Sequence, residues 1–218
     1  MKLIGLLGGT FNPIHFGHLR MAQELADTLN LAEIRFIPAA NPPHKAAPTV
    51  AAQQRAEMVQ LAIADNPLFK LDTRELNRQG ASYTIDTLMS LRAELGENAS
   101  LCLLMGSDAF TKLDSWHRWE ALLNYCHIIL VQRPNSITKK ISEKLSDKMT
   151  IFLSEHYTEN GDDLAEKTTG YIHMQQITAQ DISATYIREK LASGISAKYL
   201  VPDSVLAYIQ QHQLYKAL

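Results

Sequence analysis

Two histidines in a glycine-containing segment are the residues of this 218-residue chain best suited to chemistry. His15 and His18 are three positions apart, and a helical pattern follows them directly. If both lie in the first helical turn, their imidazole rings point the same way. The free amide groups of a helix N-terminus attract phosphate, and two imidazoles can stabilise negative charge that grows in a transition state. The segment therefore predicts a site that binds phosphate groups and acts on them.

A strand and a helix are expected to position this histidine pair. Residues 3–7 form a short apolar run, typical of a buried strand, and Gly8-Gly9 after it lets the backbone approach a bulky anion. Apolar residues then recur at helical spacing from residue 19 to residue 29. A lone histidine or a Gly-Gly turn is usually only structural, but their combination argues against that interpretation. The segment has neither the Gly-x-Gly-x-x-Gly nor the Walker pattern of other phosphate loops.

The rest of the chain continues this alternation of strands and helices. Further strands are expected at 34–37, 69–72, 101–105, 128–132 and 171–174, and helices at 53–64, 85–95, 119–123, 183–191 and 203–211. The more polar stretch 134–170 predicts a surface insertion of helix and loop. The pattern indicates one α/β domain over residues 1–218: a doubly wound, Rossmann-like parallel sheet with helices on both faces and a helical C-terminal part, 183–218. Ligands of such sheets bind beyond the carboxyl ends of the strands.

A second candidate anion site lies near the C-terminus. Ser183 suits the N-cap of a helix, Thr185 lies in its first turn, and Arg188 follows three residues later. Hydroxyls, amides and a guanidinium at one helix start can bind phosphate. Alone, this pattern would favour a merely capped helix with a surface arginine. Beside the histidine segment, phosphate binding becomes the better interpretation.

Other polar residues follow predicted strands or precede predicted helices. Each also has a plain structural explanation: a surface loop, a helix cap, a glycine turn or a packing tryptophan. These candidates are Asn41, His44 and Lys45; Tyr83 and Thr84; Gly106 and Asp108; Trp116 and His117; and Arg133.

Residues 8–18 resemble the His-x-Gly-His signature of the nucleotidyltransferase superfamily, and 182–188 resemble its Ile-Ser-x-Thr-x-x-Arg motif. The resemblance implies that His15 and His18 contact the phosphates of ATP and that the reaction proceeds by direct attack, without a covalent enzyme intermediate. It implies further ATP contacts from Gly8, Gly9, Thr10, Phe11, Ser183, Thr185 and Arg188. Family members more commonly carry Asp where this chain has Asn12, so we assign this residue no metal.

Over nearly its whole length the chain resembles one branch, the bacterial nicotinate mononucleotide adenylyltransferases. The resemblance implies transfer of the adenylyl group of ATP to nicotinate mononucleotide, a late step in NAD synthesis. It places Asn41, His44 and Lys45 at the mononucleotide phosphate, Tyr83, Thr84, Trp116 and His117 around the pyridine ring, Gly106 and Asp108 beside the ATP nucleoside, and Arg133 near the phosphates.

The expected chemistry needs positioning and charge neutralisation more than a base, because the attacking phosphate is already ionised. We expect His18, His15 and Arg188 to carry catalysis. Magnesium is expected to arrive with ATP, because no carboxylate cluster suggests a dedicated metal site.

Composition excludes several other classes. The net charge of −2 gives no general attraction to nucleic acid or to anionic membranes. Cys102 and Cys126 lie far apart in apolar runs, which argues against a disulfide framework or a zinc site. No stretch has the length of a transmembrane helix, and we expect a cytoplasmic protein. The sequence predicts no oligomeric state.

Three alternatives stay open at this stage. The acceptor could be nicotinamide mononucleotide or phosphopantetheine, although the loop of Trp116 and the chain length disfavour the latter. The chain could be a nucleotide-binding module without catalysis, against which His15, His18 and Arg188 speak. A relation to tRNA-charging enzymes is disfavoured because the chain lacks room for their extra domains and a Lys-Met-Ser-Lys-Ser run.

Overall fold

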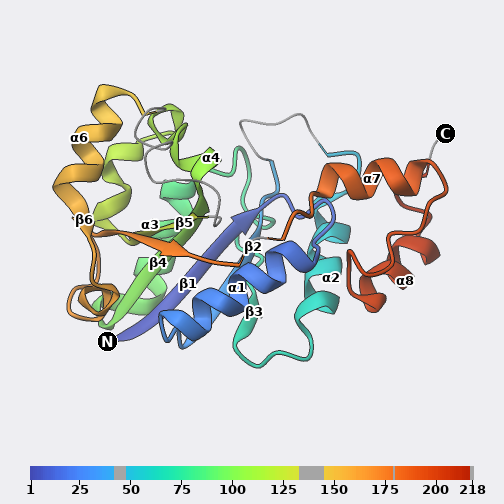
Figure 1. Cartoon of the computed structure of the whole chain (residues 1–218), viewed down its shortest axis with the longest axis horizontal. Helices are drawn as coiled ribbons and strands as arrows, with labels where there is room; N and C mark the ends of the chain where they lie inside the picture. Colours follow the sequence, from blue (N-terminus) through green and yellow to red (C-terminus); the bar gives the residue numbers. More distant parts are fainter. Residues whose placement is uncertain (42–47, 133–144, 179, 217–218) are drawn as a thin grey trace. The chain divides into compact units, whose positions relative to one another are not determined.

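The computed structural model describes residues 1–41, 48–132, 145–178 and 180–216. Its seven strands belong to one sheet, in the order β3-β2-β1-β4-β5-β7-β6 (Figure 1). The strands are β1 (Lys2–Gly9), β2 (Glu33–Pro38), β3 (Phe69–Leu71), β4 (Ala99–Gly106), β5 (His127–Gln132), β6 (Tyr157–Thr158) and β7 (Ile172–Gln176). The pairs β1–β4, β4–β5, β5–β7 and β6–β7 are parallel. The predicted α/β fold with a Rossmann-like parallel sheet is confirmed.

Helices connect the strands, as the alternation predicts. The α-helices are α1 (Phe16–Thr28), α2 (Ala52–Ile63), α3 (Thr84–Leu95), α4 (Ser107–Phe110), α6 (Asp147–His156), α7 (Ala184–Ala192) and α8 (Asp203–Gln211). Shorter 3-10 helices are η1 (Gly96–Asn98), η2 (Leu113–Ser115), η3 (Trp119–Asn124) and η4 (Gly161–Ala165). The helix expected at 119–123 is therefore of the tighter 3-10 type, which is usual for such short pieces.

The central strands are buried almost from end to end. Every residue of β4 except Gly106 is buried, and so is every residue of β5 except Gln132. Such continuous apolar runs, rather than alternating ones, are typical of parallel strands covered on both faces. This burial explains why runs such as 101–105 and 128–132 are recognisable as strands in the sequence.

The chain clusters into two compact units, and segments of both are interleaved along the sequence. Unit 1 comprises Met1–Leu7, Glu24–Ile34 and Tyr83–Thr178, and unit 2 comprises Gly8–Gln23, Arg35–Ser82 and Ala179–Leu218. Unit 1 contains β4, β5, β6 and β7 with α3 and α6, whereas unit 2 contains β3, α2, α7 and α8. A single domain over 1–218 stays a prediction.

In unit 2 the helix α8 packs against α2, as polar contacts between them show. The Tyr208 hydroxyl donates to Glu57 Oε2 at 2.5 Å, and the Ser204 hydroxyl donates to the Leu61 carbonyl at 3.2 Å. Apolar residues of α8, Val205 and Ile209, are buried. The predicted last helix, α8, thus covers the helix that follows β2.

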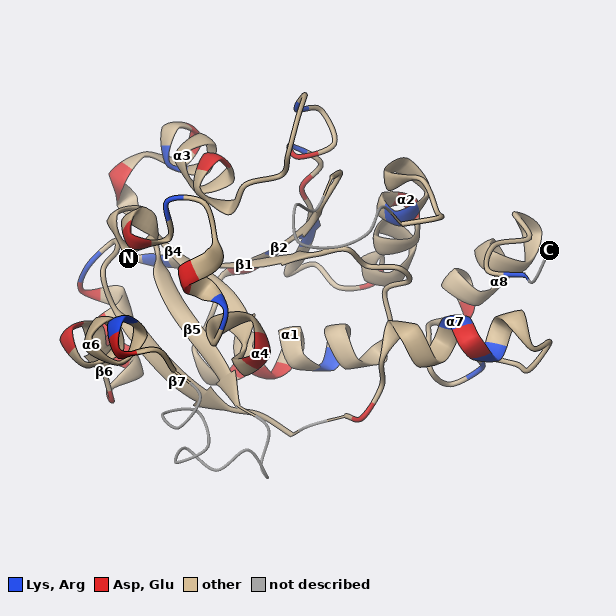
Figure 2. Cartoon of the chain, turned by 90° about the horizontal axis from the view of Figure 1, so that it is seen from above, with Lys and Arg blue, Asp and Glu red and all other residues tan. Residues whose placement is uncertain are grey.

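Charges of both signs stand close together on the helices, for example on α7, where Arg188, Glu189 and Lys190 are consecutive (Figure 2). In the part of the chain that the structure describes, no helix is long and apolar enough to span a membrane.

Candidate active site

The loop after β1 has an unusual backbone conformation at Phe11 and close packing at Gly9. Phe11 adopts a left-handed conformation with φ of 47° and is buried, with its ring centroid 5.9 Å from that of Phe36. A Cβ atom on Gly9 would lie 3.0 Å from the Phe11 ring, so a side chain there would have to push the ring aside. Glycine at this position therefore lets the Phe11 ring pack closely against the loop backbone.

The histidine pair lies where α1 begins. His15 immediately precedes the helix and His18 lies in its first turn, with the His15 carbonyl accepting from the His18 amide at 3.0 Å. Their rings stack with centroids 3.8 Å apart, and the Phe11 ring meets His18 edge-on at 5.2 Å. The two imidazoles therefore face the same region, as their spacing predicts.

Gly17 makes this stacking possible. A Cβ atom at position 17 would lie 3.0 Å from Nδ1 of His15, so any side chain there would displace the ring. His15 is 6% exposed, and burial lowers its pKa to about 4. Its Nδ1 is buried and has no hydrogen-bond partner among the residues that the structure describes. His15 is thus a neutral imidazole at neutral pH, while His18 is only partly buried.

The predicted second anion site lies in the same unit and is bonded to this loop. Ser183 caps α7, since its hydroxyl accepts from the Tyr186 amide at 3.2 Å. Arg188 donates to the Thr185 hydroxyl at 3.3 Å and to the Asn12 carbonyl at 2.8 Å. Arg188 is therefore no plain surface arginine: it joins α7 to the histidine loop and still has other N–H donors.

Sequence reasoning missed a contact from the end of the chain. The Tyr215 hydroxyl donates to Oδ1 of Asn12 at 2.7 Å, across 203 positions of sequence. Burial raises the pKa of Tyr215, so the phenol keeps its proton. Asn12 is thus held from two directions, by its carbonyl and by its side chain. Sequence analysis offers no signal for this pairing, because both residues are individually unremarkable.

Asn41 connects the segment after β2 to the segment before α3 through three hydrogen bonds. Its amide donates to the Ser82 hydroxyl at 3.3 Å, its carbonyl accepts from the Ser82 amide at 3.1 Å, and its side chain donates to the Gly80 carbonyl. The end of the loop after β2 is thereby joined to the residues that precede Tyr83.

Unit 1 carries the residues expected around the pyridine ring and the nucleoside. The rings of Tyr83 and His117 lie with centroids 4.5 Å apart; His117 is exposed and Trp116 is half-buried. Thr84 is the first residue of α3. The unit therefore brings Tyr83 and His117 together.

Gly106 ends β4, and Asp108 lies exposed in α4. Three predicted site residues, His44, Lys45 and Arg133, lie outside the described residues.

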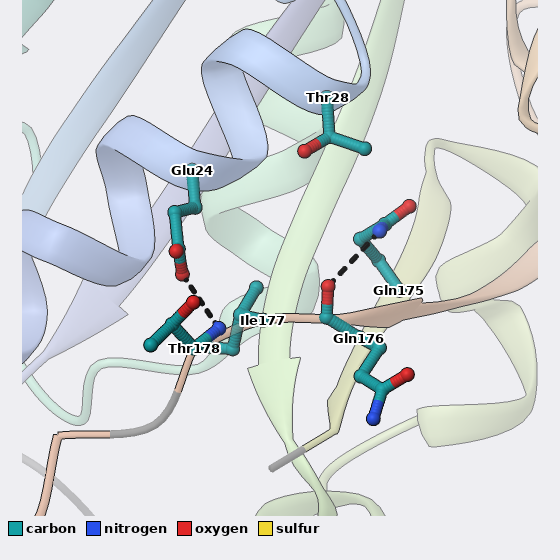
Figure 3. Close-up of a pocket in the computed structure, with 6 residues that line it drawn as sticks. All are labelled: Glu24, Thr28, Gln175, Gln176, Ile177 and Thr178. Carbon is teal, nitrogen blue, oxygen red and sulfur yellow. Dashed lines mark hydrogen bonds between the residues drawn. The ribbon is translucent and has the colours of Figure 1, made fainter. Parts of the chain in front are cut away.

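A polar pocket in unit 1 is lined by Glu24, Thr28 and residues 175–178, with the Glu24 carboxylate accepting from the Thr178 amide at 2.9 Å (Figure 3). It contains none of the predicted site residues. Within the described ranges, no three His, Cys, Asp or Glu residues are grouped so that they could hold a metal ion.

Known proteins resemble this chain over most of its length. Residues 6–190 match the family model described as cytidylyltransferase-like. The chain is 46% identical over 217 residues to a Pseudomonas putida protein named "Probable nicotinate-nucleotide adenylyltransferase", and the alignment covers 100% of this chain and 96% of the relative. It is 48% identical over 214 residues to the protein of the same name from Aeromonas salmonicida, covering 98% and 97%.

Solved structures agree on the fold. The nicotinic acid mononucleotide adenylyltransferase of Plasmodium falciparum, complexed with NaAD, aligns with a TM-score of 0.72 at 19% identity, covering 99% of this chain and 98% of that one. The chain is a nucleotidyltransferase that belongs to the cytidylyltransferase-like family and, within it, to the nicotinate-nucleotide adenylyltransferases.

Proposed function

We propose that this enzyme transfers the adenylyl group of ATP to nicotinate mononucleotide and releases pyrophosphate, as a step of NAD synthesis. The observation that carries the proposal is the stacked pair of His15 and His18 at the start of α1, joined through Asn12 to Arg188. The names of the full-length relatives and the NaAD bound to the Plasmodium falciparum protein support the choice of acceptor.

The reaction is a single displacement. An oxygen of the mononucleotide phosphate forms a bond to the α-phosphorus of ATP, and the bond from that phosphorus to the bridging oxygen of the β-phosphate breaks. The electron pair leaves with pyrophosphate. No proton must be removed from the nucleophile, so the protein contributes alignment and charge stabilisation.

We assign this task to three residues. His18 is the imidazole with solvent access and is assigned to the α-phosphate, where charge develops. His15, whose pKa is lowered to about 4, supplies a hydrogen bond and a packing surface but no positive charge. Positive charge comes from Arg188, assigned with Ser183 and Thr185 to the departing pyrophosphate.

The remaining assignments rest on family resemblance. Lys45 and His44, with Asn41, are assigned to the mononucleotide phosphate, and Arg133 to a phosphate group. The Tyr83–His117 pair, with Thr84 and Trp116, is assigned to the pyridine ring. Gly106 and Asp108 are assigned to the nucleoside of ATP.

Magnesium is proposed to arrive bound to ATP and to neutralise phosphate charge. The described residues contain no group of three or more His, Cys, Asp or Glu side chains that could hold the ion. A cytoplasmic location is proposed because Cys102 and Cys126 are free thiols.

A panel of acceptors tests the proposal. The purified enzyme, ATP and magnesium are incubated with nicotinate mononucleotide, nicotinamide mononucleotide, phosphopantetheine or no acceptor, and pyrophosphate and the adenylylated product are measured. We expect product chiefly with nicotinate mononucleotide. Stronger turnover of phosphopantetheine, or pyrophosphate formed equally without any acceptor, would refute the proposed function.

A further inference from the structure

A buried arginine behind the histidine loop has no role in the assignments above. Arg55 lies on α2 and is 1% exposed. Its guanidinium donates to four main-chain carbonyls, those of Thr10, Ala39 (2.7 Å), Ala40 (3.4 Å) and Val50 (3.3 Å). Every one of these partners is neutral, so none of them compensates its charge.

Burying a charge without a counter-charge is costly, and structural arginines are usually paired with a carboxylate. In residues 1–41, 48–132, 145–178 and 180–216 the structure gives Arg55 no carboxylate partner. Burial lowers its pKa, but guanidinium stays protonated in proteins. Its positive charge is therefore left to act on anions that bind nearby.

The four carbonyls come from three separate segments. Thr10 belongs to the loop of the histidine pair, Ala39 and Ala40 follow β2, and Val50 lies just before α2. Ala39 also donates from its amide to the Gly9 carbonyl at 2.9 Å. One side chain thus ties the loop after β1 to both flanks of residues 41–49.

We propose that Arg55 is a positioning residue that couples the binding of the two substrates. It holds the loop after β1 and the segments around Ala39 and Val50 in one arrangement, and its unpaired charge favours phosphate binding there. This inference rests on the proposed function, in which the first loop receives ATP and the stretch after β2 receives the mononucleotide.

Two substitutions separate the geometry from the charge. Arg55→Lys keeps the positive charge, but a single ammonium group cannot reach carbonyls of three segments at once. Arg55→Met removes the charge as well. We expect the KM of both ATP and nicotinate mononucleotide to rise about tenfold in Arg55→Lys, the effect of about one lost charge-assisted hydrogen bond, and further in Arg55→Met.

Arg92 is a matched control. It too donates to four carbonyls, those of Gly96, Ala99, Tyr125 and Thr168. Arg92 lies in the last turn of α3, and its partner Ala99 is the first residue of β4. Arg92→Lys should lower thermal stability comparably while leaving both KM values within about twofold of the wild type, because it touches no predicted substrate loop.

Hydrogen exchange on the wild type supplies a test that needs no variant. Binding of a non-hydrolysable ATP analogue alone should slow exchange at residues 50–51, because Arg55 links Val50 to Thr10. This measurement decides the matter if the Arg55 variants do not fold. Unchanged exchange there would overturn the coupling.

The outcomes separate the two proposals. If wild-type enzyme makes no nicotinate adenine dinucleotide, the proposed function fails, whereas calorimetric binding of each nucleotide to wild type and Arg55→Lys still tests the inference. If the wild type is active and a folded Arg55→Lys keeps both KM values, or raises only one, the inference fails and the proposed function stands.

Discussion

Folding changes the pKa of His15, because the side chain becomes buried. An ordinary histidine has a pKa near 6.5, and burial lowers that of His15 to about 4. Folding therefore favours the neutral ring. The resulting stabilisation is complete above about pH 6.5 and is lost as the pH falls toward about 4. His127, buried with a pKa of about 4, contributes in the same window.

This titration predicts a pH-dependent effect of His15→Gln. The free energy of unfolding of the wild type should fall between about pH 7.5 and about pH 5, with about 2 kcal/mol of the loss due to His15. In His15→Gln the loss should be smaller by that amount, because the contribution of His15 is removed while that of His127 remains. Urea unfolding at the two pH values measures both losses; equal losses in the two proteins would show that His15 is not held neutral.

His18 carries the central catalytic assignment at this scale. We expect His18→Ala to lower kcat by roughly a hundredfold to a thousandfold, the usual effect of removing one transition-state donor. ATP affinity should change much less, because the loop is held by Arg188 and Tyr215 rather than by this ring.

Steady-state kinetics and calorimetry with ATP measure the two effects, with His212→Ala at the exposed residue directly after α8 as control. A folded His18→Ala protein with near-normal turnover would exclude a direct role of this imidazole.

At the scale of elements, two serine-capped helices allow a matched comparison. Ser183 caps α7 through the Tyr186 amide, and Ser146 caps α6 through the Met149 amide. Replacing either serine by alanine should reduce the free energy of unfolding by about 1 kcal/mol. Only Ser183→Ala should also raise the KM for ATP, because its helix carries Thr185 and Arg188.

Thermal unfolding and ATP titration of both variants test this expectation. If Ser146→Ala raised the KM for ATP as much as Ser183→Ala does, the assignment of the α7 start to the phosphates would lose its support.

The long elements were predictable because their patterns are local. The buried runs in β4 and β5 and the helical spacing in α1 and α8 follow from the apolar sequence alone. The two-residue β6 and the four-residue α4 are too short to show any period, and neither was predicted.

At the scale of the whole molecule, what the sequence could not provide is contact between distant segments. The pattern 182–188 identifies Thr185 and Arg188 as neighbours, and they are hydrogen-bonded. Nothing local predicts that Arg188 and Tyr215 both reach Asn12, or that Arg55 reaches Thr10. Such contacts depend on how the chain returns to the loop after β1, which tertiary packing decides.

The preference for nicotinate over nicotinamide mononucleotide determines which dinucleotide the enzyme makes. A carboxylate accepts hydrogen bonds and donates none, whereas the amide of nicotinamide presents an NH2 group. We propose that main-chain amides near Thr84 and His117 donate hydrogen bonds to the ring substituent. The NH2 group of nicotinamide would then face other donors. The difference should correspond to roughly tenfold to a hundredfold in kcat/KM.

A competition assay measures this preference most directly. Nicotinate and nicotinamide mononucleotides are mixed in equal amounts with limiting ATP and magnesium, and the two dinucleotide products are quantified by mass. Because the competitors share one enzyme and one ATP pool, the product ratio equals the ratio of their kcat/KM values. The proposed function predicts that nicotinate adenine dinucleotide dominates by about tenfold or more; equal products, or an excess of the nicotinamide dinucleotide, would contradict it.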